Sequence, residues 1–107
     1  MSDQVIVVLT TFPDAAGAER MATELIQANL AACVNILPAM TSVYGWKGKT
    51  ERGEEHQLVI KSSPARYAAL EAFIQKEHPY ELPEILMFAA RDGFPPYIEW
   101  VYACTEN

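Results

Sequence analysis

Two apolar runs near opposite ends of the chain restrict its fold more than any other feature. VIVVL spans residues 5–9 and ILMFAA spans residues 85–90, and neither alternates apolar with polar residues. Side chains of a strand point to opposite faces in turn, so a strand with one solvated face shows such an alternation. We therefore predict that both runs lie in strands, over residues 5–12 and 84–90, whose two faces are both buried.

Two stretches between these runs carry the periodicity of amphipathic helices. Residues 16–29 place their apolar side chains on one face, and Asp14 precedes them as a predicted N-cap. A second helix is predicted to begin at Ser63-Pro64, with serine as the cap and proline at the first helical position. It must end before Pro79, because the residue before a proline avoids helical dihedral angles.

The remaining segments complete an alternating order of elements. Residues 32–46 read as an extended segment interrupted at Pro38, KGKTERG is predicted to form the turn, and residues 54–62 return as a strand. A short helix is predicted over residues 95–104. The order βαββαβ plus a helix is typical of an α+β, ferredoxin-like sandwich, with two helices on one face of a four-stranded antiparallel sheet. We predict a single domain over residues 1–107.

Two helices can cover only one face of the predicted sheet, so its second face needs another cover. A second copy of the chain is the simplest candidate. The terminal helix could fold under the sheet instead, but one short helix cannot shield a whole face. We therefore predict self-association. The hairpin of residues 32–62 is long for so small a domain, and we expect its tip, with Trp46, to contact a neighbouring subunit.

Charge and motifs exclude several classes of function. The formal net charge is −6, which argues against binding of nucleic acid or of anionic membranes. The sequence has no apolar run of membrane-spanning length and no signal-peptide pattern, so we expect a cytoplasmic protein. It carries no phosphate-binding glycine loop and no nucleophile–base set, so we predict no enzymatic activity. Cys33 and Cys104 make no disulfide framework, and Cys33 is expected to be a buried thiol.

Other candidate residues are expected to be structural. His56 alternates with the apolar residues of its strand and is predicted at a strand end or an interface. The aromatic residues Tyr44, Trp46, Trp100 and Tyr102 are predicted to pack in the core or between subunits, because an acidic chain is a poor partner for bases.

The stretch KEHPYELPEI is the strongest candidate for a site. Glu77, His78 and Glu81 lie within five residues, and a neutral imidazole with carboxylates binds copper or zinc well. Their spacing matches no closed-site template, so further ligands would have to come from elsewhere. The same stretch also suits a stiff corner, because Pro79 ends a helix and Pro83 shapes the chain before the next strand. The two readings do not exclude each other.

Several segments together resemble one known family. LAACVNILPAMTSVYGWKGK, HPYELPEI and YIEWV, in this order, resemble the CutA family of divalent-cation-tolerance proteins, and the resemblance covers almost the whole chain. It implies a ferredoxin-like homotrimer in which long strands of one subunit extend the sheets of its neighbours. It also implies a link to copper tolerance, binding of divalent copper or other divalent cations, and no established enzymatic activity.

The resemblance also implies positions for metal ligands. His78 matches the histidine of the family's HPY segment, Glu77 stands where metal-binding members have a second histidine, and Thr10 stands where they have a cysteine. Threonine is a poor ligand for a soft or borderline metal. We therefore predict weak binding of Cu²⁺ or another divalent cation by His78, Glu77 and Glu81. The alternative is a trimeric signalling or scaffold protein that binds a small ligand or a partner in inter-subunit clefts.

Overall fold

The computed structural model describes residues 4–106. Its strands are β1 (Ile6–Phe12), β2 (Cys33–Ile36), β3 (Met40–Trp46), β4 (Lys49–Ser62) and β5 (Leu86–Ala89), and its helices are α1 (Ala15–Gln27), the 3-10 turn η1 (Pro64–Arg66), α2 (Tyr67–Glu77) and α3 (Pro95–Cys104). The prediction that the sequence has no signal-peptide pattern rests in part on residues 1–3, which lie outside the described residues. Within residues 4–106, no helix is both long and apolar enough to cross a membrane.

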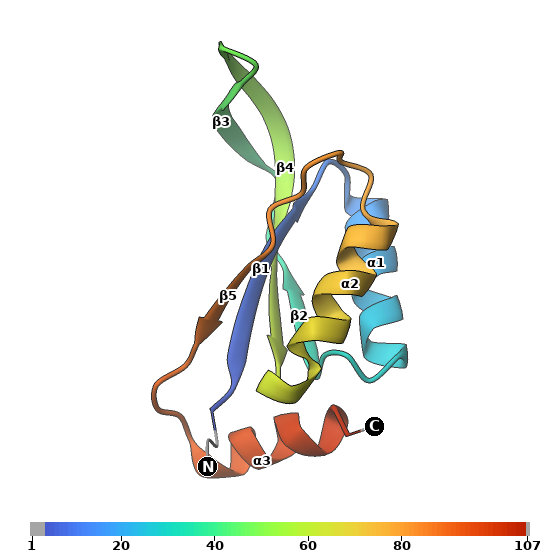
Figure 1. The fold of residues 1–107 in the computed structure, drawn as a ribbon, viewed down its shortest axis with the longest axis vertical. Coiled ribbons are helices and arrows are strands. Elements are labelled where there is room, and N and C mark those ends of the chain that lie inside the picture. Colours follow the sequence, from blue (N-terminus) through green and yellow to red (C-terminus); the bar gives the residue numbers. More distant parts are fainter. Residues whose placement is uncertain (1–3, 107) are drawn as a thin grey trace.

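The strands form an antiparallel sheet in the order β2-β4-β1-β5, and β3 pairs with the part of β4 that β2 does not reach. Helices α1 and α2 lie side by side on one face of this sheet (Figure 1). The predicted α+β, ferredoxin-like fold is therefore confirmed. The interruption at Pro38 is also confirmed, because β2 ends at Ile36 and β3 begins at Met40.

The predicted turn between the two strands of the hairpin is wrong in its extent. Strand β4 begins at Lys49, and its pairing with β3 runs from Trp46↔Lys49 to Met40↔Glu55. The loop contains only Lys47 and Gly48, whose φ angles are 51° and 80°. Two residues with positive φ are sufficient for a tight hairpin whose twist matches that of its strands. The polar residues that suggested a longer turn belong to an exposed strand.

The core lies between the sheet and the two helices. Its fully buried side chains include Val8, Leu25, Leu58, Ile60, Leu70 and Ile74. Asp14 caps α1 as predicted, since its Oδ1 accepts a hydrogen bond of 2.7 Å from the backbone N–H of Gly17. Ser63 does precede η1 but makes no capping bond. Its hydroxyl instead bonds the hydroxyl of Thr105 at 2.9 Å, which ties α3 to the sheet.

The sheet face opposite α1 and α2, called here the outer face, is largely uncovered in the single chain. Val7 pairs with Phe88 and Leu9 pairs with Leu86, so these four apolar side chains share that face. Phe88 is 53% exposed and Leu86 is 51% exposed. Helix α3 crosses the foot of the molecule (Figure 1). The predicted burial of both faces is therefore not achieved within one chain.

The hairpin projects beyond the body of the domain. Strand β3 and the first half of β4, residues 40–55, form an arm that gives the molecule its length of 44 Å against widths of 26 and 24 Å (Figure 1). Val43, Tyr44 and Trp46 on this arm are exposed. Contact of the arm with a neighbouring subunit stays a prediction. Cys33, predicted to be buried, is half-buried at the start of an edge strand.

Candidate functional site

His78 lies at the end of α2, where both of its ring nitrogens are hydrogen-bonded to the backbone. The backbone N–H of Tyr80 donates to Nδ1 at 3.1 Å, so Nδ1 is an acceptor and the ring proton resides on Nε2. Nε2 then donates to the carbonyl oxygen of Thr11 at 2.7 Å. The imidazole thereby joins the segment after α2 to the end of β1.

The surroundings of His78 favour its neutral form. The ring is 9% exposed and packs between Phe12, at 4.3 Å between ring centroids, and Tyr80, at 4.9 Å. Burial lowers the pKa of His78, against smaller opposing effects of the bond to Thr11 and the negative charge of Glu55. This geometry supports the corner interpretation of the HPY segment.

The other two predicted ligands do not converge on the imidazole. Glu77 and Glu81 are both exposed. Among the described residues, no group of three or more His, Cys, Asp or Glu side chains is placed to hold a metal ion. The chain by itself therefore does not gather His78, Glu77 and Glu81 into a ligand set, and their ligand roles stay a prediction.

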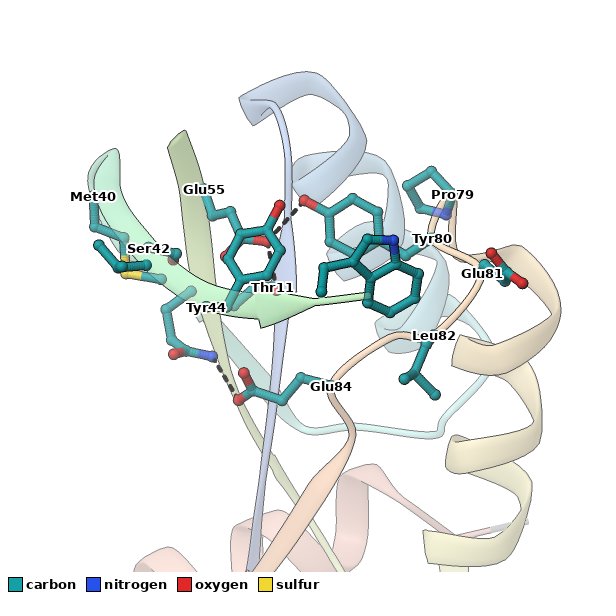
Figure 2. Close-up of a pocket in the computed structure, with 13 residues that line it drawn as sticks. Thr11, Met40, Ser42, Tyr44, Glu55, Pro79, Tyr80, Glu81, Leu82 and Glu84 are labelled. Atoms are coloured by element: carbon teal, nitrogen blue, oxygen red, sulfur yellow. Dashed lines mark hydrogen bonds between the residues drawn. The ribbon is translucent and has the colours of Figure 1, made fainter. Parts of the chain in front are cut away.

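Glu55 is the central residue that sequence reasoning missed. Its Oε2 accepts hydrogen bonds from the hydroxyls of Tyr80, at 2.7 Å, and Thr11, at 3.1 Å (Figure 2). Burial raises the pKa of Glu55, but the hydrogen bonds from Ser42, Tyr80 and Thr11 and the charge of His78 outweigh it, so the pKa lies below its usual value. The alternation of side chains along β4 could have identified Glu55, since it lies on the same face of the strand as Gln57.

Tyr80 is the partner that fixes this carboxylate. Burial raises the pKa of its phenol, and the hydrogen bond to Glu55 and the charge of that carboxylate raise it further. The hydroxyl therefore stays protonated and donates to Glu55 throughout the physiological range. The backbone N–H of Tyr80 also donates to Nδ1 of His78, which holds Tyr80 in position. The corner thus positions a donor for a carboxylate that is 25 residues away in sequence.

A cleft of about 760 Å³ lies between the arm and the segment of residues 79–84. Its lining includes the aromatic residues Tyr44, Trp46 and Tyr80 and the carboxylates Glu55, Glu81 and Glu84. Among the described residues, no lysine or arginine lines it. In Figure 2 the Glu81 carboxylate points away from Glu55. The amide of Gln57 donates to the carbonyl of Thr10 at 2.8 Å and reaches Glu84 at 3.5 Å.

Thr10 lies on the helix-covered face of the sheet. It pairs with Leu58, is fully buried, and its hydroxyl has no hydrogen-bond partner within the described residues. A buried hydroxyl without a partner costs free energy that an apolar side chain of similar shape does not. Within the described residues, the hydroxyl of Thr10 thus contributes no polar contact to the cleft or to His78.

Replacement of Thr10 by valine is expected to stabilise the protein. The free energy of unfolding should rise by about 1–2 kcal/mol, because a β-branched side chain is kept and the unpartnered hydroxyl is removed. Chemical denaturation measures the change. Thr11→Val is the matched control, because the hydroxyl of Thr11 donates to Glu55 and its loss should destabilise. A loss of stability in Thr10→Val would contradict the assignment of an unpartnered hydroxyl.

Comparison with known proteins gives a consistent result. Residues 6–104 match the family model described as CutA1 divalent ion tolerance protein. The chain is 45% identical over 98 residues to the divalent-cation tolerance protein CutA of Yersinia pestis (strain Pestoides F), covering 92% of this chain and 82% of that protein. Its structure is similar to that of CutA from Xylella fastidiosa, with a TM-score of 0.94 and 37% identity over 98% of this chain and 100% of that one. CutA1 from Oryza sativa gives a TM-score of 0.93 and 36% identity, over 98% of both chains.

Proposed function

The chain belongs to the CutA1 family of divalent ion tolerance proteins, and from this premise we propose that it acts in copper tolerance as a homotrimer that binds Cu²⁺ or another divalent cation weakly. The proposal includes no enzymatic reaction.

The uncovered outer face supports the homotrimer. Leu86 and Phe88 are about half exposed in the single chain, beside Val7 and Leu9 on the same face. Within the described residues, β5 pairs only with β1 and β3 pairs only with β4, so each strand has one unpaired edge. Exposed edges and apolar faces are the features that strand pairing between chains removes. In the proposed trimer, the arm of one subunit covers part of a neighbour.

The hydrogen bonding of His78 is the main observation in favour of weak cation binding. Its imidazole can ligate a metal only after one of two backbone hydrogen bonds is released, which costs about 1 kcal/mol or more. Glu77 and Glu81 are exposed and offer oxygen ligands. Among the described residues, however, they belong to no group of three side chains that could hold a metal ion. Within one chain these residues do not fit a closed metal site. We therefore propose that the two carboxylates make the first contact with the cation.

Titration calorimetry with cupric ion tests this proposal. The dissociation constant of the wild-type protein is expected to be weaker than about 10 μM, and the double variant Glu77→Gln/Glu81→Gln should weaken it several-fold. The matched control Glu19→Gln/Glu71→Gln removes the same charge from exposed positions on α1 and α2 and should leave the affinity nearly unchanged. Tight binding that the first double variant does not alter would place the metal elsewhere.

The second candidate function is that of a signalling or scaffold protein that binds a small ligand. The cleft between the arm and residues 79–84 favours it, because 760 Å³ lies within the range of small-molecule sites. In that case, metal binding would be incidental, and the cleft would hold the physiological ligand.

A further inference from the structure

The cleft carries negative charge that no side chain of its lining balances. Glu55, Glu81 and Glu84 line it, and no lysine or arginine among the described residues does so. Gln57 contacts Glu84 through a neutral amide, and the hydroxyls of Tyr80 and Thr11 contact Glu55, so these hydrogen-bond donors to Glu55 and Glu84 are uncharged. A ligand that complements this cleft therefore carries positive charge.

Glu55 is already ordered for such a ligand. Two hydroxyl donors, from Tyr80 and Thr11, fix its Oε2 (Figure 2). Tyr80 is itself held by its backbone hydrogen bond to His78. The hydrogen bonds keep the carboxylate ionised in spite of its partial burial. A carboxylate that is fixed before binding loses little conformational freedom when a cation arrives, which favours affinity.

Apolar and aromatic side chains line most of the remaining surface of the cleft. Tyr44 and Tyr80 flank Glu55 in Figure 2, and Trp46, Val43 and Leu82 also line the space. Aromatic faces attract cations within about 6 Å of the ring centroid. The ammonium of Lys47 lies 5.7 Å from the centroid of the Trp46 ring, so this indole already takes part in such a contact.

These features select among cations. A divalent metal ion needs several oxygen or nitrogen ligands that converge on one point, and no such group exists among the described residues. An organic cation instead needs one or two carboxylates for its charged end and apolar walls for its skeleton. The cleft offers the second combination.

We propose that the cleft between the arm and residues 79–84 binds a small organic cation, with an ammonium or guanidinium group held by Glu55 and an apolar skeleton packed against Tyr44 and Trp46. The inference deepens the second candidate function by naming the chemical class of its ligand. It differs from the metal proposal, which concerns Glu77, His78 and Glu81, because Glu55 holds the charged group. Glu81 also lines the cleft, but its carboxylate points away from Glu55.

The test compares two probes of nearly equal shape on the intact protein. 2-Phenylethylammonium carries the charge, and 2-phenylethanol is its neutral counterpart. In ¹H–¹⁵N spectra, the ammonium should shift the amides of Ser42, Tyr80 and Glu84, and it should bind at least about tenfold more tightly than the alcohol, which corresponds to about 1.4 kcal/mol.

Glu55→Gln should remove this preference for charge and leave the affinity for the alcohol nearly unchanged. The comparison of two probes on one variant separates loss of charge recognition from damage to the fold, since damage would weaken both. Glu54→Gln is the matched control, because Glu54 is the adjacent exposed carboxylate on the opposite face of β4, and it should keep the preference. Trp46→Leu should weaken both probes several-fold.

Three results would overturn the inference. One is equal affinity of the wild-type protein for the ammonium and the alcohol. Another is the absence of shifts at Ser42 and Tyr80, as expected if a neighbouring copy fills the cleft. The third is displacement of the ammonium by one equivalent of cupric ion per chain, which would assign the cleft to metal. Because cupric titration without the probe is measured separately, failure of this inference and failure of the metal proposal are distinguishable.

Discussion

Phe88→Asp is expected to convert the proposed homotrimer into monomers at micromolar concentration. Phe88 is 53% exposed in the single chain and shares the outer face with its partner Val7 on β1. If neighbouring copies bury this face, a carboxylate there loses its hydration without gaining a partner, which costs several kcal/mol per subunit. A closed trimer contains this defect three times, so the effect on assembly should far exceed that of a typical surface change.

Sedimentation equilibrium measures the outcome. The wild-type protein should give three times the mass of the chain, and Phe88→Asp should give the mass of one chain. Ala72→Asp is the matched control, because it adds the same charge at an exposed position of α2, in the layer on the opposite side of the sheet. A wild-type protein that sediments as a monomer would contradict the proposed homotrimer, and so would a Phe88→Asp variant that remains trimeric.

His78→Ala is expected to lower the free energy of unfolding by about 2–4 kcal/mol. The substitution leaves a cavity between Phe12 and Tyr80, which both contact the ring. It also removes the partners of two backbone groups, the carbonyl of Thr11 and the N–H of Tyr80. Denaturant unfolding at a fixed protein concentration measures the loss, since dissociation of an oligomer contributes to its stability.

His78→Gln provides the control for this prediction. Its side-chain amide keeps a donor for the carbonyl of Thr11, so it should recover part of the lost stability. Equal stability of the wild-type protein and His78→Ala would mean that the corner does not depend on the imidazole. In that case, Pro79 and Pro83 would be the main support of the corner.

The pH dependence of stability is expected to differ between the wild type and His78→Gln. The folded-state pKa of His78 lies below its ordinary value of 6.5, so the unfolded chain binds a proton more readily than the folded one. Stability is therefore fully present above about pH 6.5 and falls as the pH drops from there toward the folded-state pKa. His78→Gln should lack this contribution. Superimposable pH profiles of the two proteins between pH 7 and 5 would contradict the neutral, buried imidazole.

Glu55 contributes to the pH dependence of stability in a lower pH range than His78 does. Its folded-state pKa lies below the ordinary value of 4.5, so its contribution is present above that value and is lost as the pH falls further. The contribution of His78 begins to change at a higher pH than that of Glu55, so it can be measured first as the pH is lowered from 7.

The sequence by itself determined the fold and most of its elements. Apolar periodicity located both helices that cover the sheet, and Asp14 was identified correctly as the cap of α1. The order of elements was sufficient to predict the ferredoxin-like sandwich. The terminal helix was predicted over the residues that form it, since α3 spans Pro95–Cys104. These features are local, because side-chain periodicity and capping depend on residues within a few positions of one another.

Tertiary structure decided the length of the arm and the roles of the polar residues. Hydrogen bonding with β3 extends β4 back to Lys49, through polar residues whose composition favours a turn. Contacts over long sequence separations bring Thr11, Glu55 and Tyr80 together. Both ring nitrogens of His78 are engaged in hydrogen bonds with the backbone. Sequence proximity placed Glu77 and Glu81 beside His78, but the packing of the ring against β1 turned it away from them. Which carboxylate meets which donor depends on strand register and on burial, and neither is encoded in the spacing of residues along the chain.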